Sequence, residues 1–139
     1  MTIEQFIRRD VVTATMDASA AELARLMKDE AVGSVVVVSG ETPVGIVTDR
    51  DIVLYVVAVD SVPVDVTARD LMSEDLFTVD TEAETFAVMG RMADAGVRRV
   101  PVVEGGSLVG IVTLDDLVVV LANELGSLAG VIEGEMPNA

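Results

Sequence analysis

The sequence contains no histidine and no cysteine among its 139 residues. It therefore lacks the most common general base, the most common metal ligand and the thiol nucleophile, and no disulfide framework is possible. It also contains neither the G-x-S-x-G pattern of hydrolases nor a phosphate-binding loop that ends in Gly-Lys-Ser or Gly-Lys-Thr. Because the usual catalytic groups and motifs are missing, we predict that the protein is not an enzyme and needs no cofactor.

Basic and aromatic residues are also scarce. Aromatic residues make up 3% of the chain, Lys28 is the single lysine, and 24 acidic residues give a formal net charge of -15. A field of this sign repels nucleic acid phosphates, and there are too few aromatic rings to stack bases, so we predict no nucleic acid partner. The acidic balance resembles that of proteins from a high-salt cytoplasm, which predicts an origin in a halophilic archaeon.

Long apolar runs are missing as well. The longest, Ile52–Val59, has eight residues, well below the roughly 18 that a membrane span needs. The first ten residues lack the apolar stretch of a secretion signal. We therefore expect a cytoplasmic protein that does not enter a membrane.

What the sequence does contain is an internal repeat. Residues 2–53 align with residues 67–118 at a constant offset of 65, without a gap, and 18 of the 52 aligned pairs are identical. The longest shared run is VGIVT, at Val44–Thr48 and Val109–Thr113. A repeat of this size is typical of a supersecondary unit that buries its apolar face against a copy of itself. We predict two packed repeats at 1–59 and 67–125, a linker at 60–66 and an acidic tail at 126–139.

Each repeat carries the same local signals. Ser19 and Glu22 form a capping-box pattern before a helix at 20–30, and a β-branched run at 35–38 and a segment at 43–47 read as two strands joined by a turn. The second repeat predicts a helix at 85–95 and strands at 100–103 and 108–112. Thr48 with Asp51, and Thr113 with Asp116, again match capping boxes, so we expect helices after both despite the β-branched residues that follow.

The junction between strand and helix is the candidate site. Free backbone N-H groups at a helix start suit a phosphate, and a threonine hydroxyl can donate to the same group. An aspartate one turn later can accept from the vicinal hydroxyls of ribose. Thr48/Asp51 and Thr113/Asp116 therefore fit a nucleoside phosphate, although the same residues can also serve only to cap a helix.

The gapless duplication, the motifs GIVTDRD and GIVTLDD, and GVRRVPVV at Gly96–Val103 together resemble the tandem CBS domain pair, or Bateman module. The resemblance extends from Thr2 to about Leu125. It implies an α/β fold of two β-α-β-β-α repeats packed as a pseudo-two-fold pair, with two clefts that bind AMP, ADP, ATP or S-adenosylmethionine.

Carried over residue by residue, the resemblance assigns ribose binding to Asp51 and Asp116 and phosphate binding to Thr48 and Thr113. It places a basic group for phosphate at Arg98 and Arg99, with Arg50 as a further candidate. The adenine is expected between apolar strands and near the start of the other repeat, in a pocket made by Thr13, Ala14, Thr78, Val79, Val36 and Pro101. Since the first repeat has Gly33 and Ser34 in place of the arginine pair, we expect the cleft with Asp116 to favour the more highly charged nucleotide.

The leading hypothesis is a regulatory module that senses an adenosine compound and signals to an effector protein, which the sequence does not identify. A second hypothesis is a structural dimerisation module without a functional nucleotide site, because apolar helices at 52–59 and 117–121 can form a self-complementary face. A third is an acid-lined Mg²⁺ sensor. The first two hypotheses predict a homodimer.

Overall fold

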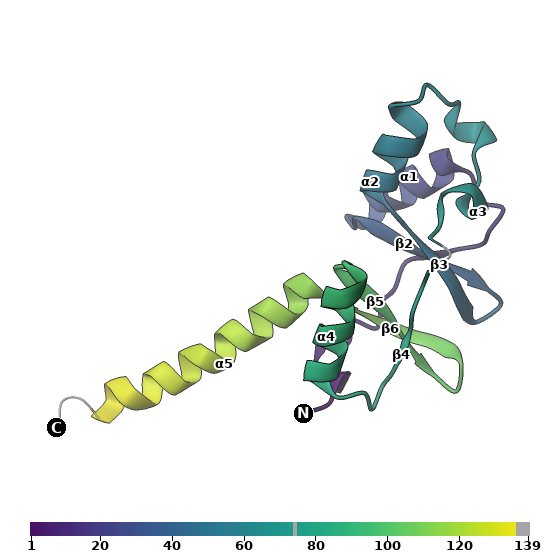
Figure 1. Cartoon of the computed structure of the whole chain (residues 1–139). Coiled ribbons are helices and arrows are strands. Elements are labelled where there is room, and N and C mark those ends of the chain that lie inside the picture. Colours follow the sequence, from purple (N-terminus) through teal and green to yellow (C-terminus); the bar gives the residue numbers. More distant parts are fainter. Residues whose placement is uncertain (74, 136–139) are drawn as a thin grey trace.

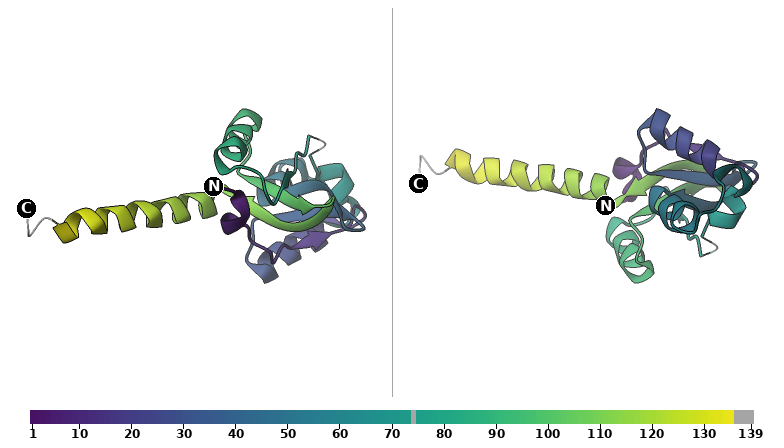
Figure 2. Two further views of the ribbon diagram at one scale, coloured as in Figure 1. Left: turned by 90° about the horizontal axis from the view of Figure 1, so that it is seen from below. Right: turned by 90° about the horizontal axis from the view of Figure 1, so that it is seen from above.

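A computed structural model describes residues 1–73 and 75–135. Two halves, each with a three-stranded sheet, pack against one another, and a long helix projects from the second half (Figures 1 and 2). In chain order the elements are η1 (Ile3–Phe6), β1 (Thr13–Ala14), α1 (Ala20–Glu30), β2 (Ser34–Ser39), β3 (Thr42–Thr48), α2 (Asp49–Ile52), η2 (Val53–Val57), η3 (Pro63–Asp65), α3 (Ala68–Leu71), β4 (Val79–Asp80), α4 (Thr85–Ala95), β5 (Arg99–Glu104), β6 (Ser107–Thr113) and α5 (Leu114–Glu135).

The two sheets have the same topology. In each, a short strand pairs in parallel with the middle strand, which forms an antiparallel hairpin with the third, in the orders β1-β2-β3 and β4-β5-β6. Both hairpins shift register at the same place, between Val37 and Val38 and between Val102 and Val103. The duplication in the sequence is therefore a duplication of structure, and the predicted α/β class with two related units is confirmed.

The helices α1 and α4 begin and end where local signals predict. Ser19 and Glu22 form the capping box of α1, and Ala31 closes that helix in the left-handed conformation. In α4 the carboxylate of Glu84 accepts from two backbone N-H groups of the first turn, and Gly96 closes the helix at φ 67°. Each helix lays one apolar side against its sheet, where Met27 and Met92 occupy matching buried positions.

The core of each half contains a segment from the start of the other repeat. Ile3 and Phe6 of η1 are buried in the core of the second half, beside Val88 of α4. Ala68 and Leu71 of α3 are buried in the core of the first half. The chain therefore crosses between the halves between η1 and β1 and again between α3 and β4. A smaller apolar cluster that includes Val36, Ile46 and Ile111 joins the two sheets.

The segments after the two shared Thr residues are helical, as the capping boxes predict. α2 passes into one π-helical turn, η2, whereas α5 continues for 22 residues. The tail that was expected from Gly126 onward is thus helical as far as Glu135, and residues 136–139 lie outside the described residues. Glycines that are spaced four apart did not end the helix, although glycine is a poor helix former.

Candidate functional site

The first strand-to-helix junction is a closed capping box. The Thr48 hydroxyl accepts a hydrogen bond from the Asp51 backbone N-H at 3.2 Å, and the Asp51 carboxylate accepts one from the Thr48 N-H at 2.8 Å through Oδ2. A hydroxyl that accepts one bond keeps its own hydrogen to donate, and a carboxylate has further acceptor capacity on its second oxygen. Capping therefore leaves both side chains able to meet a ligand.

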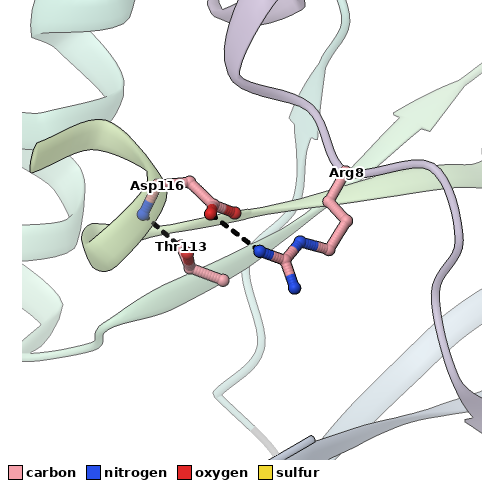
Figure 3. Close-up of polar contacts among 3 residues, drawn as sticks. All are labelled: Arg8, Thr113 and Asp116. Carbon is pink, nitrogen blue, oxygen red and sulfur yellow. Dashed lines mark hydrogen bonds and ion pairs between the residues drawn. The ribbon is translucent and has the colours of Figure 1, made fainter. Parts of the chain in front are cut away.

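The hydrogen bonds of the second junction differ from those of the first, as Figure 3 shows. The Asp116 N-H donates to the Thr113 hydroxyl at 3.1 Å, but the Asp116 carboxylate accepts from the Arg8 guanidinium at 2.8 Å through Oδ1. Oδ2 of Asp116 is buried and has no hydrogen-bond partner among the described residues. A buried carboxylate oxygen without a partner is costly, so this atom is poised to accept from a donor.

Arg8 reaches this position because its backbone is fixed to the edge of the second sheet. Arg8 and Ile111 exchange both backbone hydrogen bonds at 2.9 Å. At the neighbouring Gly110 a Cβ atom would lie 2.9 Å from the Arg8 carbonyl oxygen, closer than real Cβ atoms approach. Since the repeat offset of 65 aligns Arg8 with Ser73, the other half has no cation at the equivalent position.

Two clefts lie between the halves, one at each junction. The first, here called the Asp51 cleft, has a volume of about 560 Å³ and is lined by Ile46, Thr48, Asp49, Arg50, Asp51, Ser73, Gly96, Val97, Arg98 and Arg99. The second, the Asp116 cleft, has about 200 Å³ and is lined by Arg8, Asp10, Val11, Val12, Ala31, Val32, Gly33, Ser34, Val36, Arg98, Arg99, Ile111, Thr113, Asp115 and Asp116. Sites for small ligands usually measure about 300 to 1,000 Å³. Of these two clefts, the Asp51 cleft falls in that range. A further hollow of about 350 Å³ adjoins the Arg8–Asp116 pair and is lined by Gln5, Phe6, Ile7, Arg8, Asp116, Val119 and Val120.

The charges in the two clefts differ as well. In the Asp51 cleft three arginines (50, 98 and 99) accompany two aspartates, on a chain that is strongly acidic overall. In the Asp116 cleft three arginines accompany three aspartates, and two ion pairs engage them: Arg8 with Asp116 at 2.8 Å and Arg98 with Asp115 at 3.1 Å. Since Arg98 is already paired with Asp115, Arg50 and Arg99 are the arginines of the Asp51 cleft that make no ion pair among the described residues.

The structure brings most of the predicted polar residues together. Thr48, Arg50 and Asp51 line the first cleft, and Thr113 and Asp116 line the second. The expectation that Arg98 and Arg99 would distinguish the second cleft needs correction, because both arginines line both clefts. They follow the end of α4, at the position where the two halves meet.

The residues predicted for the adenine pocket do not lie together in one cleft. Val36 lines the Asp116 cleft, but Thr13, Ala14, Thr78, Val79 and Pro101 line neither cleft. The reason is that the parallel pairing of β1 with β2 directs the chain into the sheet at Thr13, and β4 does the same at Val79. Val11 and Val12, which come just before β1, line the cleft instead.

Sequence reasoning missed Arg8, Ser73, Gly96 and Val97 as cleft residues. Arg8 lies 108 positions from Asp116, so no local motif joins the two. The one available signal was the repeat register, which sets Arg8 opposite Ser73 and Gly96 opposite Ala31. Within residues 1–73 and 75–135, no three Asp or Glu side chains gather in a way that suits a metal ion.

The chain matches the family model described as the CBS domain twice, at residues 3–58 and 68–132. It is 40% identical over 119 residues to an uncharacterised protein of Methanopyrus kandleri, and the aligned region is 84% of this chain and 61% of that protein. It is 32% identical over 121 residues to the CBS domain-containing protein YhcV of Bacillus subtilis, and the aligned region is 85% of this chain and 84% of that protein.

Among solved structures, the fold is similar to that of the CBS domain pair of protein MJ0100, solved in complex with 5′-methylthioadenosine and S-adenosyl-L-methionine. The TM-score is 0.80 at 22% identity, over 89% of this chain and 98% of that one. Relatives such as YhcV consist largely of the same two repeats, which form a regulatory rather than a catalytic module. The two family matches, in register with the two sheets, place this chain in the CBS domain family as a tandem CBS pair.

Proposed function

We propose that this CBS pair senses an adenosine compound that carries phosphate, and that the Asp51 cleft is the primary binding site. The observation that carries the proposal is the combination, in one cleft of about 560 Å³, of a capped helix start with the arginine pair of the other half. The helix is short, but Arg98 and Arg99 supply independent positive charge for an anion.

The residues of this cleft have separate tasks in the proposal. The Thr48 hydroxyl donates its free hydrogen to a phosphate oxygen, and the Asp51 carboxylate accepts from a ribose hydroxyl through Oδ1 while Oδ2 holds the cap. Arg98 and Arg99 bind phosphate from the opposite half. A ligand held in this way touches both halves at once.

The charge of the cleft favours phosphate over a sulfonium. AMP, ADP and ATP carry negative charge that complements the arginines of the cleft, whereas S-adenosylmethionine places a positive centre beside the same arginines. The similar fold of the MJ0100 pair, whose ligands are two adenosine compounds, supports the adenosine part of the proposal. The ranking of ligands rests on the arginines of this chain.

Signalling follows if the ligand binds the closed arrangement of the two halves better than an open one. Helices near the clefts then move, and an effector protein or a second copy reads the change. Val53, Leu54, Tyr55 and Val57 of η2 are each at least 39% exposed, which leaves an apolar face directly after the Asp51 cleft. We propose this face as a homodimer contact in a cytoplasmic protein.

The exposed face also favours the second candidate, a dimerisation module without a functional nucleotide site. Calorimetric titration with AMP, ATP and S-adenosylmethionine separates the two. We expect heat for AMP and ATP and weaker heat for S-adenosylmethionine. Signals equal to the buffer control for all three ligands would leave the dimerisation module as the function.

Asp51→Ala is the decisive variant, with Asp70→Ala as its matched control. Asp70 makes the same capping box with Thr67 but lines neither cleft. Both variants lose a cap, typically about 1 kcal/mol of stability, whereas only Asp51→Ala should lose nucleotide binding. Equal loss of binding in the two variants would assign Asp51 to capping alone.

A further inference from the structure

The protruding part of α5 is the largest unexplained feature of the molecule. α5 begins at Leu114, packs against the core of the second half through Leu117 and Val120, and then extends away from both halves, as Figures 1 and 2 show from three sides. Residues 122–134 are all exposed. Leu125, Leu128, Val131 and Ile132 are 62 to 67% exposed, more than most apolar side chains of the chain.

The apolar residues of α5 follow a heptad pattern. Leu114, Leu121 and Leu128 are seven apart, and so are Val118, Leu125 and Ile132, with alternating steps of four and three between the two series. They correspond to d and a positions of a coiled coil and form one stripe along the helix. Asn123, Ser127 and Glu133 lie on the opposite side, together with Gly126 and Gly130, whose surroundings are open.

A helix of this composition is not stable on its own in water. Gly126, Gly130 and Gly134 each cost about 0.8 to 1.0 kcal/mol relative to alanine in a helix interior. An isolated helix of 12 to 15 residues is marginal even when it is rich in alanine. The apolar stripe must therefore be covered by another surface for α5 to persist as a helix.

A bilayer is a poor cover for this stripe. Leu114–Gly134 is long and apolar enough to cross a membrane, with a mean hydropathy of 1.5. However, Glu124 would then lie near the middle of the bilayer, where an acidic residue costs about 2.5 to 3.5 kcal/mol. α5 also has no Lys or Arg, so it has nothing to attract anionic head groups, while Asp115, Asp116, Glu124 and Glu133 repel them.

We propose that α5 pairs with α5 of a second copy in a parallel, two-stranded coiled coil from Val118 to Ile132. Val at the first a position and Leu at d positions are typical of parallel dimers. In this arrangement Glu124, at position g, faces Ala129 at position e of the second copy. An antiparallel pair with full overlap sets Glu124 against the same residue of the second copy, which is unfavourable. This pairing is independent of nucleotide binding.

Engineered cysteines test the pairing directly, since the natural chain has none. Leu128→Cys places one thiol at a d position, where two copies meet, and Gly126→Cys places one on the opposite face. Under mild oxidation the full-length Leu128→Cys chain should form a disulfide-linked dimer at low micromolar concentration. The Gly126→Cys chain should stay largely monomeric under denaturing electrophoresis. Equal cross-linking of both variants, or of neither, overturns the proposal.

Light scattering on the Leu128→Glu and Asn123→Glu variants gives a second readout. Both add one negative charge to exposed positions of α5, but only Leu128 lies in the stripe. We expect Leu128→Glu to weaken association by roughly 100-fold or more because each copy loses a buried leucine, and Asn123→Glu to behave as the unchanged chain. An unchanged mass for Leu128→Glu contradicts the pairing.

Flotation of the unchanged chain with neutral and anionic vesicles tests the remaining alternative. We expect no association with either, and binding that is lost in Leu128→Glu would assign the stripe to a membrane. Nucleotide titration of Leu128→Glu should match that of the unchanged chain, so a failure of this pairing is distinguishable from a failure of the proposed sensing function.

Discussion

The two clefts begin with the same residues and end with different properties. Both have a Thr and an Asp three residues apart at a strand end, yet Asp51 binds its own helix start whereas Asp116 binds Arg8 from the far end of the chain. The Asp51 cleft has about 560 Å³ and the Asp116 cleft about 200 Å³. A duplicated motif therefore provides a duplicated scaffold, and a third residue, Arg8 or Ser73, gives the two junctions different charges and hydrogen bonds.

The comparison also shows how capping and binding relate. Thr48 and Asp51 satisfy the helix start and still have one hydrogen and one oxygen to offer. In the second copy only one of the two capping hydrogen bonds is made, from the Asp116 N-H to the Thr113 hydroxyl. Oδ2 of Asp116 is buried and has no hydrogen-bond partner among the described residues. Capping thus leaves bonding capacity open in the first copy, whereas Arg8 already occupies one carboxylate oxygen in the second.

The largest effect is expected from Gly110→Ala, which breaks the contact that places Arg8. The new methyl group meets the Arg8 carbonyl oxygen and the Ile7 side chain, so the N-terminal segment must move off β6. We expect a loss of about 2 kcal/mol in the free energy of unfolding, measured by urea denaturation. Gly45→Ala is the matched change in the other half, where the atoms nearest to the new methyl group are side-chain atoms of Met72, including its Cβ, rather than backbone atoms. A larger loss in Gly45→Ala than in Gly110→Ala would contradict the contrast.

Arg99→Ala sharpens the comparison through the ligand. Removing one charged donor to phosphate typically costs about 1.5 to 3 kcal/mol, so ATP affinity should fall by roughly 10- to 100-fold. Adenosine, which has no phosphate, should bind as before. Arg25→Ala removes an exposed arginine of α1 that lines neither cleft, and it should leave both affinities unchanged. Calorimetry with both ligands measures the difference, and parallel losses for ATP and adenosine would remove Arg99 from the phosphate site.

Arg8→Ser makes the second cleft resemble the first, since Ser73 is the equivalent residue. Without the guanidinium, the Asp116 carboxylate is free and the cleft widens toward the size of a nucleotide site. We expect the stoichiometry of binding to rise from about one ligand per chain to about two. Ser73→Arg is the reciprocal test and should weaken binding in the Asp51 cleft. An unchanged stoichiometry in Arg8→Ser would mean that Arg8 does not limit ligand binding in the Asp116 cleft.

The smallest effect is expected from acid. Hydrogen bonds from the backbone N-H groups of Phe86 and Ala87 lower the pKa of Glu84 from its usual 4.5. Hydrogen bonds with the backbone N-H and then the side chain of Thr67 lower the pKa of Asp70 from its usual 3.8. A carboxylate whose pKa is lower in the folded state stabilises the fold above its unfolded pKa. That contribution is lost as the pH falls through the folded value. We therefore expect a gradual decrease in melting temperature below about pH 4, with a shallower decrease in Glu84→Gln.

Much of the fold could be predicted from the sequence because its signals are local. The capping box of Ser19 and Glu22 fixes the start of α1, and the valine runs fix β2 and β5 to within one residue at each end. Thr48, Asp51, Thr113 and Asp116 were found because each pair is three residues apart and the pairs repeat. Local spacing and duplication suffice for elements and motifs.

What could not be predicted depends on long-range placement or on surfaces outside the chain. Arg8 is brought to Asp116 by a backbone pairing with Ile111, which no pattern near Arg8 announces. The glycines at 126 and 130 favoured an end to the last helix, whereas the heptad stripe that extends it to Glu135 acts only when another surface covers it.

The exchange of end segments between the halves has a consequence for the protein as a whole. Ile3 and Phe6 complete the core of the second half, and Ala68 and Leu71 complete that of the first. A cut in the segment 60–66 therefore separates each sheet from a piece of its own interior. Neither fragment contains a complete core, because the core of the second half needs η1 and that of the first half needs α3.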